Sequence, residues 1–141
     1  MTSLIVDASV AVKWFVDEED TDRATLLLER AERICAPRII LGEVANAIWK
    51  TVRRGDMSQE LGAEAVADLP RFVTLLFDTD HFMADALRIA CALDHPIYDC
   101  LYVESARRLK LPLVTADARM ARKFSAGPYA QHIIPLSDWR P

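Results

Sequence analysis

Four acidic residues occupy positions where a carboxylate is unusual, either directly after an apolar run or inside one. They are Asp7 after Leu4-Ile5-Val6, Glu43 within Ile39–Trp49, Asp99 within Ile97–Val103, and Asp117 just after Leu113-Val114-Thr115. A carboxylate in apolar surroundings is costly unless it is paired, protonated or bound to a metal ion. If the four acids share one crevice, their mutual repulsion calls for a cation. Hard divalent ions with oxygen ligands fit best, so we expect Mg²⁺, with Mn²⁺ as the alternative.

Each acid also has an ordinary structural interpretation. Asp7, Asp99 and Asp117 each stand where the N-cap of a following helix is expected. Glu43 could be a partly exposed acid in the first turn of a helix, where the helix dipole favours it. Each of these explanations accounts for one acid by itself. None of them explains why all four acids fall at strand ends or helix starts.

The histidines and cysteines do not indicate another kind of metal centre. His81, His95 and His132 are scattered without the spacing of zinc ligands, and we expect them at the surface. The three cysteines form no CxxC pair, which is typical of reduced thiols in a cytoplasmic protein.

Short apolar runs alternate with helix-like segments along the chain. Strands are expected at 3–7, 34–36, 72–76, 113–115 and 132–134, and helices at 8–15, 22–33, 37–54, 58–69, 79–93, 98–109 and 118–125. This alternation predicts an α/β fold, with a parallel sheet inside an α/β/α sandwich. The carboxyl ends of parallel strands meet at one edge, where ligands bind in open α/β sheets. Asp7 and Asp117 end two of these strands and are expected at that edge together.

Length and composition favour one globular domain over residues 1–141. The chain has 141 residues, of which 52% are hydrophobic, and this excludes a disordered chain. No apolar run approaches the roughly 18 residues of a membrane span. The N-terminus also lacks the basic, apolar and small-residue order of a signal peptide. We therefore expect a cytoplasmic protein with no membrane segment.

The net charge of −4 hides an uneven distribution. Residues 99–141 carry seven basic and four acidic side chains, although the chain as a whole is acidic. A local basic patch can attract an anionic partner such as RNA. The alternative is an ordinary solvated helix surface. The candidate phosphate contacts are Arg107, Arg108, Arg119, Arg122 and Lys123, followed by Arg54 on the Glu43 helix.

The sequence around the four acids resembles the PIN-domain family. The matching segments are Val-Asp-Ala-Ser at Asp7, Leu-Gly-Glu-Val-Ala-Asn-Ala at Glu43, Tyr-Asp-Cys-Leu-Tyr at Asp99 and Thr-Ala-Asp-Ala-Arg at Asp117. The resemblance covers the whole chain and is closest to the VapC-type toxins of bacterial toxin–antitoxin modules. It implies a PIN-like fold and a Mg²⁺-dependent endoribonuclease that a cognate antitoxin inhibits and that is usually a homodimer.

The resemblance also assigns roles to individual residues. It makes Asp7, Glu43, Asp99 and Asp117 the catalytic, metal-binding acids. Ser9, Asn46 and Thr115 match frequent neighbours that orient the acids or the attacking water. Some family members carry a further acid after the fourth one, but here Ala118 and Arg119 follow Asp117. The number of metal ions, one or two, therefore stays open.

The available groups favour a metal-activated water as the nucleophile. The sequence offers no evident serine, cysteine or histidine nucleophile with a base partner, and a bound ion lowers the pKa of its water. Asp7 and Asp99 would hold the principal ion. Glu43 and Asp117 would complete the shell, hold a second ion or orient the water.

Two other classes of protein remain as alternatives. A non-catalytic PIN-like RNA-binding module is expected to lack one of the acids, and all four are present. A Mg²⁺-binding phospho-acceptor signalling domain is expected to end a later strand in lysine, whereas strand 113–115 is followed by Ala116-Asp117. A nuclease assay with and without EDTA separates the three.

An antitoxin that blocks this site would meet acids at the metal centre and apolar walls beside them. An amphipathic helix that carries apolar anchors and a cation suits such a groove. Trp14, Phe15 and Trp49 are the candidate wall residues, with packing in the core as the alternative for each.

Overall fold

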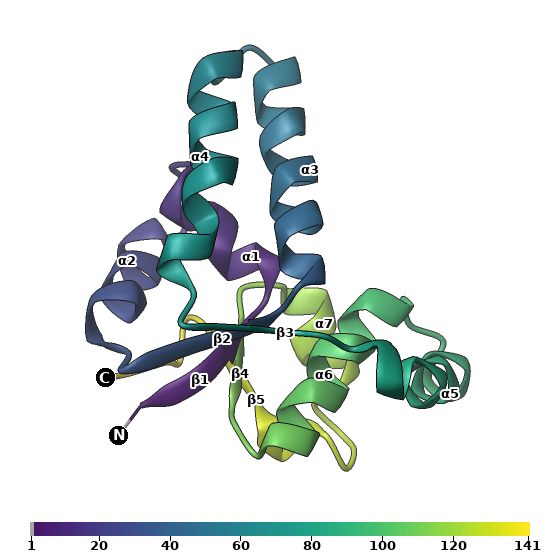
Figure 1. The fold of residues 1–141 in the computed structure, drawn as a ribbon. Helices are drawn as coiled ribbons and strands as arrows, with labels where there is room; N and C mark the ends of the chain where they lie inside the picture. Colours follow the sequence, from purple (N-terminus) through teal and green to yellow (C-terminus); the bar gives the residue numbers. More distant parts are fainter. Residues whose placement is uncertain (1) are drawn as a thin grey trace.

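All five strands of the structure run parallel in one sheet, in the order β3-β2-β1-β4-β5 (Figure 1). This computed structural model describes residues 2–141. The strands are β1 Ser3–Val6, β2 Arg33–Pro37, β3 Leu75–Phe77, β4 Leu113–Thr115 and β5 Ile133–Pro135. The arrangement confirms the predicted α/β fold with a parallel sheet, and the central strand is β1.

Helices cover both faces of the sheet. In Figure 1, α1, α3 and α4 lie on one face and α6 lies on the other. The α-helices are α1 Ala8–Ala11, α2 Thr21–Arg30, α3 Ile39–Arg53, α4 Gln59–Phe72, α5 Met83–Leu93, α6 Ile97–Leu109 and α7 Ala118–Lys123. Three 3₁₀ turns are η1 Val12–Trp14, η2 Asp80–Phe82 and η3 Ala130–His132. Across residues 2–141 no helix is both long enough and apolar enough to cross a membrane.

Strand pairing places the predicted site at one edge of the sheet. β1 pairs with β2 on one side and with β4 on the other, and Val6 lies opposite Val114. Asp7 follows β1 directly, and Asp117 follows β4 after one intervening residue. The two acids therefore emerge at the same edge, as the strand pattern predicts.

Three expected boundaries are wrong, each where packing or backbone geometry overrides local sequence preference. Phe72 ends α4 and does not begin a strand, because its ring stacks on Phe15 and meets Trp14 edge to face. Pro70, expected to stop that helix, lies inside its last turn. Pro37, expected at the start of a helix, is the last residue of β2 and pairs with Phe77 of β3.

The remaining boundaries differ by a few residues. The helix expected at 22–33 ends at Arg30, because Arg33 already pairs with β1. The segment 8–15 is a four-residue helix followed by a 3₁₀ turn, and the helix expected at 118–125 ends at Lys123. Ser58 is confirmed as the N-cap of α4, since its hydroxyl accepts a bond from the amide of Leu61 at 3.2 Å.

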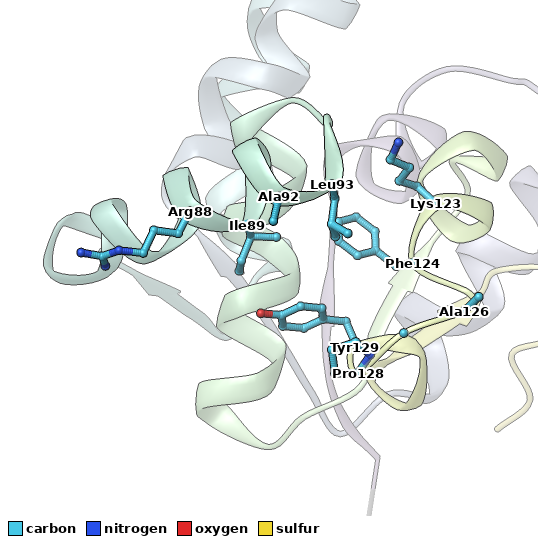
Figure 2. Close-up of a pocket in the computed structure, with 10 residues that line it drawn as sticks. Arg88, Ile89, Ala92, Leu93, Lys123, Phe124, Ala126, Pro128 and Tyr129 are labelled. Carbon is cyan, nitrogen blue, oxygen red and sulfur yellow. The ribbon is translucent and has the colours of Figure 1, made fainter.

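The segment after α7 folds back against α5. Phe124 in this segment meets Tyr129 edge to face, with ring centroids 6.0 Å apart (Figure 2). Phe124 is only 2% exposed and belongs to the main core. The Phe124 ring also meets His95, two residues before α6, at 5.3 Å, so the segment between β4 and β5 packs beside the start of α6.

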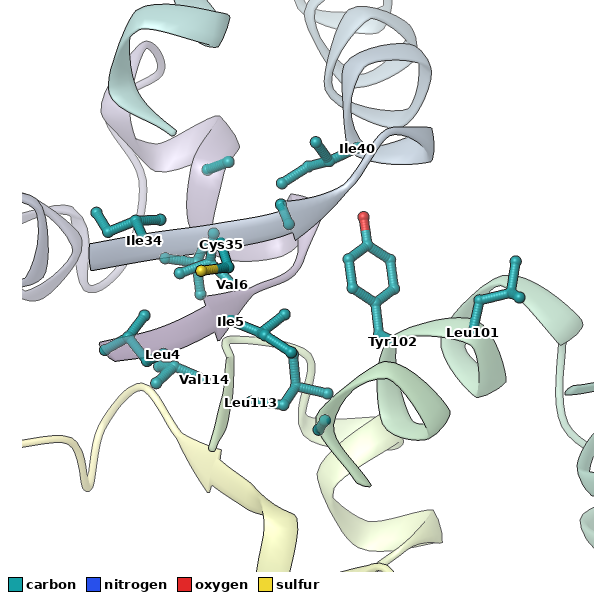
Figure 3. Close-up of a cluster of buried hydrophobic side chains, with 14 of the residues drawn as sticks. Leu4, Ile5, Val6, Ile34, Cys35, Ile40, Leu101, Tyr102, Leu113 and Val114 are labelled. Carbon is teal, nitrogen blue, oxygen red and sulfur yellow. The ribbon is translucent and has the colours of Figure 1, made fainter. Parts of the chain in front are cut away.

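The core lies on both faces of the central strands. Ile5, Val6, Leu113 and Val114 are fully buried, as expected for parallel strands covered by helices on both sides. Figure 3 shows Tyr102 of α6 entering this cluster with its hydroxyl directed toward the start of α3. The core thus delivers one polar group to the edge where the acids lie.

The helices α3 and α4 form a hairpin that extends away from the sheet (Figure 1). Gly55 makes the turn with a φ of +86°, in the region that favours glycine. Gly62 allows α4 to approach α3, since a Cβ there would lie 3.1 Å from side-chain atoms of Ile48 and Val52.

Leu113→Ala tests whether β4 is a core strand of this sheet. β4 pairs with β1 and β5, and the Leu113 side chain is fully buried on a covered face of the sheet, so its loss should lower the free energy of unfolding by about 2–5 kcal/mol. Urea denaturation followed by circular dichroism measures this. Leu109→Ala is the matched control, because Leu109 is 43% exposed and should change stability by less than about 0.5 kcal/mol. Equal effects of the two substitutions would contradict the buried placement of β4.

Candidate active site

Asp7 is the most enclosed of the four acids. It is 5% exposed, and its carboxylate accepts bonds from the hydroxyls of Ser9 and Thr115, both at 2.5 Å, and from the amide of Val10 at 3.3 Å. Burial raises the pKa of Asp7 to about 6, although these three bonds oppose the rise. The bond from Val10 also makes Asp7 the N-cap of α1. Asp7 therefore has the helix-capping role considered from the sequence and is also a candidate site residue.

The hydroxyls of Ser9 and Thr115 connect two neighbouring turns at this edge. Ser9 Oγ accepts a bond from the amide of Ala116 at 2.9 Å, and Thr115 Oγ1 accepts one from the amide of Asp117 at 3.0 Å. The turn after β1 and the turn after β4 are therefore tied together around Asp7. The sequence predicted Ser9 and Thr115 as neighbours of the acids, and the structure places both in direct contact with one.

Asp99 is held by a histidine. Its Oδ2 lies 2.7 Å from Nε2 of His95, and the His95 side chain is only 7% exposed. Burial raises the pKa of Asp99, the bond to His95 lowers it, and the negative charge of Asp117 raises it further. Asp99 is the third residue of α6 and not its N-cap, which is Pro96. The expectation of a surface position is thus wrong for His95, and its place one turn before Asp99 is the clue in the sequence.

Glu43 is held by a tyrosine from another helix. The hydroxyl of Tyr102 donates to Oε1 of Glu43 at 2.9 Å, and Tyr102 is 1% exposed. Burial raises the pKa of Glu43, and the charge of Asp99 adds to the rise against the bond from Tyr102. Glu43 is the fifth residue of α3, beyond the first turn, so the helix-dipole interpretation does not hold. Tyr102 was not predicted as a site residue, although it follows Asp99 by three positions on the same helix face.

Asp117 is engaged in its own helix. Its Oδ1 accepts bonds from the amides of Arg119 at 2.9 Å and Met120 at 3.2 Å, as the N-cap of α7. Its negative charge nevertheless reaches Asp99 and contributes to the raised pKa there. Asp117 therefore has both the structural role considered from the sequence and a place beside the other acids.

The acids form an electrostatically coupled group at the sheet edge. The charge of Asp99 raises the pKa of both Asp7 and Glu43, and the pKa of Tyr102 is raised well above its usual value by burial and by these three acids. Within residues 2–141, no three acidic, histidine or cysteine side chains converge closely enough to hold a metal ion as arranged. Burial and mutual repulsion disfavour the negative charge of these carboxylates. Carboxylate oxygens are nevertheless the ligands that hard divalent ions prefer. In donor chemistry and charge, the residues fit such an ion.

The predicted basic residues fall into two groups. Arg107 and Arg108 both bind buried Glu104, at 2.5 and 2.9 Å, and lie about 12 Å or more along α6 from Asp99. The bonds from Arg107 and Arg108 lower the pKa of Glu104. Arg119, Arg122 and Lys123 on α7 instead border a pocket that contains His95. The second group is the one beside the acids.

Two other predicted residues lie farther from the acids or make no contact with them. Arg54 caps the far end of α3, about 16 Å along the helix from Glu43, and pairs with Asp56. Asn46 is exposed, and in the part of the chain that the structure describes it forms no side-chain hydrogen bond.

Known proteins are similar to this chain in sequence and fold. A family model described as PIN domain matches residues 4–124. Ribonuclease VapC3 of Pyrobaculum aerophilum is 32% identical over 127 residues, which cover 87% of this chain and 95% of the relative. The crystal structure of PAE2754 from Pyrobaculum aerophilum matches with a TM-score of 0.73 and 20% identity over 96% of this chain and 90% of that one. A toxin–antitoxin complex from Klebsiella pneumoniae matches with a TM-score of 0.62 and 13% identity over 94% of this chain and 97% of that one.

Asp7→Asn tests the buried charge. A folded-state pKa of about 6 against an ordinary 3.8 means that the folded protein holds the proton more tightly, so stability is lost as pH rises from about 4 through 6. The asparagine variant escapes this loss and keeps an acceptor for the N-cap. In metal-free buffer it should be more stable than wild type by about 3 kcal/mol at pH 8, and by progressively less toward pH 4.

Urea denaturation in EDTA between pH 4.5 and 8 measures this difference. Asp17→Asn is the control, because it makes the same side-chain change at an exposed position. A wild-type protein as stable as the Asp7→Asn variant at pH 8 would show that the buried carboxylate carries no penalty.

Proposed function

The chain belongs to the PIN-domain family, and on that premise we propose that it is a metal-dependent endoribonuclease, the toxin of a type II toxin–antitoxin pair. The relative Ribonuclease VapC3 supports RNA as the substrate class. The observation that carries the proposal is the coupled group of acids at the sheet edge, in which Asp7, Glu43 and Asp99 all have raised pKa values. Such a group has its charge stabilised when a divalent cation binds.

In this proposal the four acids are the catalytic and metal-binding residues. Asp7 and Asp99 hold the principal ion, which is Mg²⁺, with Mn²⁺ as a substitute. Glu43 and Asp117 complete the site. When bound, the ion supplies positive charge opposite the phosphate oxygens and lowers the pKa of water, so that hydrolysis proceeds near neutral pH.

The neighbours of the acids position them. Ser9 and Thr115 hold Asp7, and His95 and Tyr102 hold Asp99 and Glu43 respectively. Each of these bonds lowers the pKa of its acid and so favours the charged form that binds cations. Each carboxylate keeps further lone pairs for a ligand, because a carboxylate has about four acceptor sites. Outer partners of this kind orient metal ligands in other proteins.

The amide variants Asp7→Asn, Glu43→Gln, Asp99→Asn and Asp117→Asn test the proposed catalytic role. Each should reduce Mg²⁺-dependent RNA cleavage by more than about 100-fold, because even the outer partners of a metal site are worth about 10- to 100-fold. Cleavage of a labelled RNA, followed on denaturing gels with Mg²⁺ and with EDTA, measures this.

Asp17→Asn is again the control and should retain full activity. Activity that survives EDTA, or that survives in the Asp7→Asn and Asp99→Asn proteins, would remove the proposed site. RNA binding without any cleavage would favour the non-catalytic RNA-binding module instead.

The solved toxin–antitoxin complex with this fold supports an antitoxin as the partner. We place its docking segment in an apolar groove of about 390 Å³ between α3 and α4, beside Trp49, which is 53% exposed. Trp49 lies six residues after Glu43, about 9 Å along α3 and about 120° around it, so a partner seated in the groove needs a further segment that passes around α3 to cover the acids. Trp14 and Phe15 do not line this groove, because they pack on Phe72 and Trp14 Nε1 donates to the carbonyl of Ala24.

Trp49→Ala tests this docking site. It should weaken inhibition by an antitoxin C-terminal peptide at least about tenfold, since exposed aromatic anchors often dominate such interfaces, while RNA cleavage stays near wild type. Peptide titration in the cleavage assay measures the inhibition. Leu109→Ala, another exposed apolar residue, is the control and should be inhibited normally. Equal inhibition of all three proteins would place the antitoxin elsewhere.

The remaining parts of the proposal are a homodimer and action in the cytoplasm. Met83 and Leu87, one turn apart on α5, are 39% and 53% exposed and offer an apolar strip for a second copy. An RNA substrate supports action in the cytoplasm.

A further inference from the structure

A basic pocket lies directly beside the proposed acid site. It has a volume of about 390 Å³ and is lined by Asp94, His95, Pro96, Arg119, Arg122 and Lys123. Three cations face one carboxylate there, so the lining is positive. In residues 2–141, none of these three cations has an acidic partner within 4.0 Å, whereas Arg107 and Arg108 are both bound to Glu104.

Contacts tie this pocket to Asp99. His95 lies in the pocket wall and is bonded to Asp99 at 2.7 Å. The positive charge of Arg119 reaches Asp99 and lowers its pKa. Only the His95 side chain would therefore lie between an anionic group in the pocket and Asp99, which we place in the catalytic site.

A second, apolar pocket adjoins the basic one and shares Lys123 with it. It has a volume of about 310 Å³, and Figure 2 shows its walls on α5 and on the segment after α7. Its apolar lining is formed by Ile89, Ala92, Leu93, Phe124, Pro128 and Tyr129, with Arg88 and Lys123 also on its border. Phe124 separates the two pockets, because its ring meets His95 at 5.3 Å on one side and Tyr129 at 6.0 Å on the other.

We propose that the two pockets together form a nucleotide-binding subsite for the RNA substrate. The basic pocket binds a backbone phosphate, and the apolar pocket takes the unpaired base of a neighbouring nucleotide. This inference rests on the proposed ribonuclease function, and it adds that the substrate is bound as single-stranded RNA.

The chemistry of each pocket fits its half of a nucleotide. Arginine forks suit phosphate oxygens, and Arg119 and Arg122 are free of acidic partners within residues 2–141. Unpaired bases bind to aromatic and apolar side chains, and such contacts are worth a large share of single-strand affinity. The cations that border the apolar pocket favour an anionic chain over a purely apolar segment of protein. A base inside a duplex cannot enter, so the subsite selects single-stranded RNA.

Binding of RNA to the non-cleaving Asp7→Asn protein tests the subsite. The probes are a fluorescein-labelled single-stranded 12-mer RNA and the same 12-mer in a perfect duplex, measured by fluorescence anisotropy with Mg²⁺ over a range of salt concentrations. Adding Arg122→Gln and Lys123→Gln together should weaken binding of both probes at least about tenfold and reduce the salt slope by about 1–2. The control pair, Arg30→Gln with Arg33→Gln, lies at the opposite edge of the sheet. It should leave the affinity for both RNA probes unchanged.

Ala92→Leu tests the base pocket by filling it without removing a core side chain. It should weaken binding of the single strand about fivefold or more and leave the duplex unchanged. The control is Ala63→Leu, which adds the same bulk to an exposed alanine in the groove between α3 and α4. Circular dichroism confirms that each variant is folded.

The outcomes separate this inference from the ribonuclease proposal. If wild type cleaves RNA but the Arg122–Lys123 and Ala92 variants bind both probes normally, the subsite is wrong and the enzyme assignment stands. If wild type does not cleave but the variants lose single-strand binding, the subsite stands and the enzyme assignment fails. If Ala92→Leu instead changes the molecular mass in solution and not RNA affinity, a second copy fills the pocket and the subsite is overturned.

Discussion

The structure depends on the burial of one carboxylate, that of Asp7, at the end of the central strand. Burial opposes its charge strongly enough to bring its pKa to about 6. Folding tolerates it because Ser9, Thr115 and the amide of Val10 all donate to it. The same hydroxyls join the turns after β1 and β4. The contacts that make the acid tolerable therefore also build the sheet edge at which the other acids gather.

The acids of this chain differ in function because their partners differ. Glu104 is as buried as Asp7, but two arginines bind it and lower its pKa, so its charge is fully compensated and its role is structural. The partners of Asp7, Glu43 and Asp99 are hydroxyls, a backbone amide and an imidazole but no arginine or lysine, and the pKa values of these acids are raised. A protein that leaves one buried and two partly buried acids without an arginine or lysine partner gives up stability at neutral pH. This loss of stability is expected at a site that binds a cation, because the bound cation stabilises the charged acids of the folded state.

The proposed binding surfaces lie on the two sides of the acids. The groove beside Trp49 belongs to the hairpin of α3 and α4, whose base carries Glu43. The basic and apolar pockets belong to α5 and α7, next to Asp99. A partner seated in the groove would not occupy the RNA subsite, and it would cover the acids only with a further segment that passes around α3. Inhibition and substrate binding then compete only at the acids themselves.

The sequence by itself determined the alternation of strands and helices, the common edge for Asp7 and Asp117, and the four acids as the candidate site. Local patterns suffice for these because strand ends and helix starts depend on nearby residues. The partners of the acids were decided by tertiary structure. Tyr102 bonds Glu43 across 59 positions and Thr115 bonds Asp7 across 108. Packing also moved Phe72 from strand to helix and left Arg119 and Arg122, but not Arg107 and Arg108, beside the acids. Pairing between distant side chains depends on the whole fold, which no local pattern records.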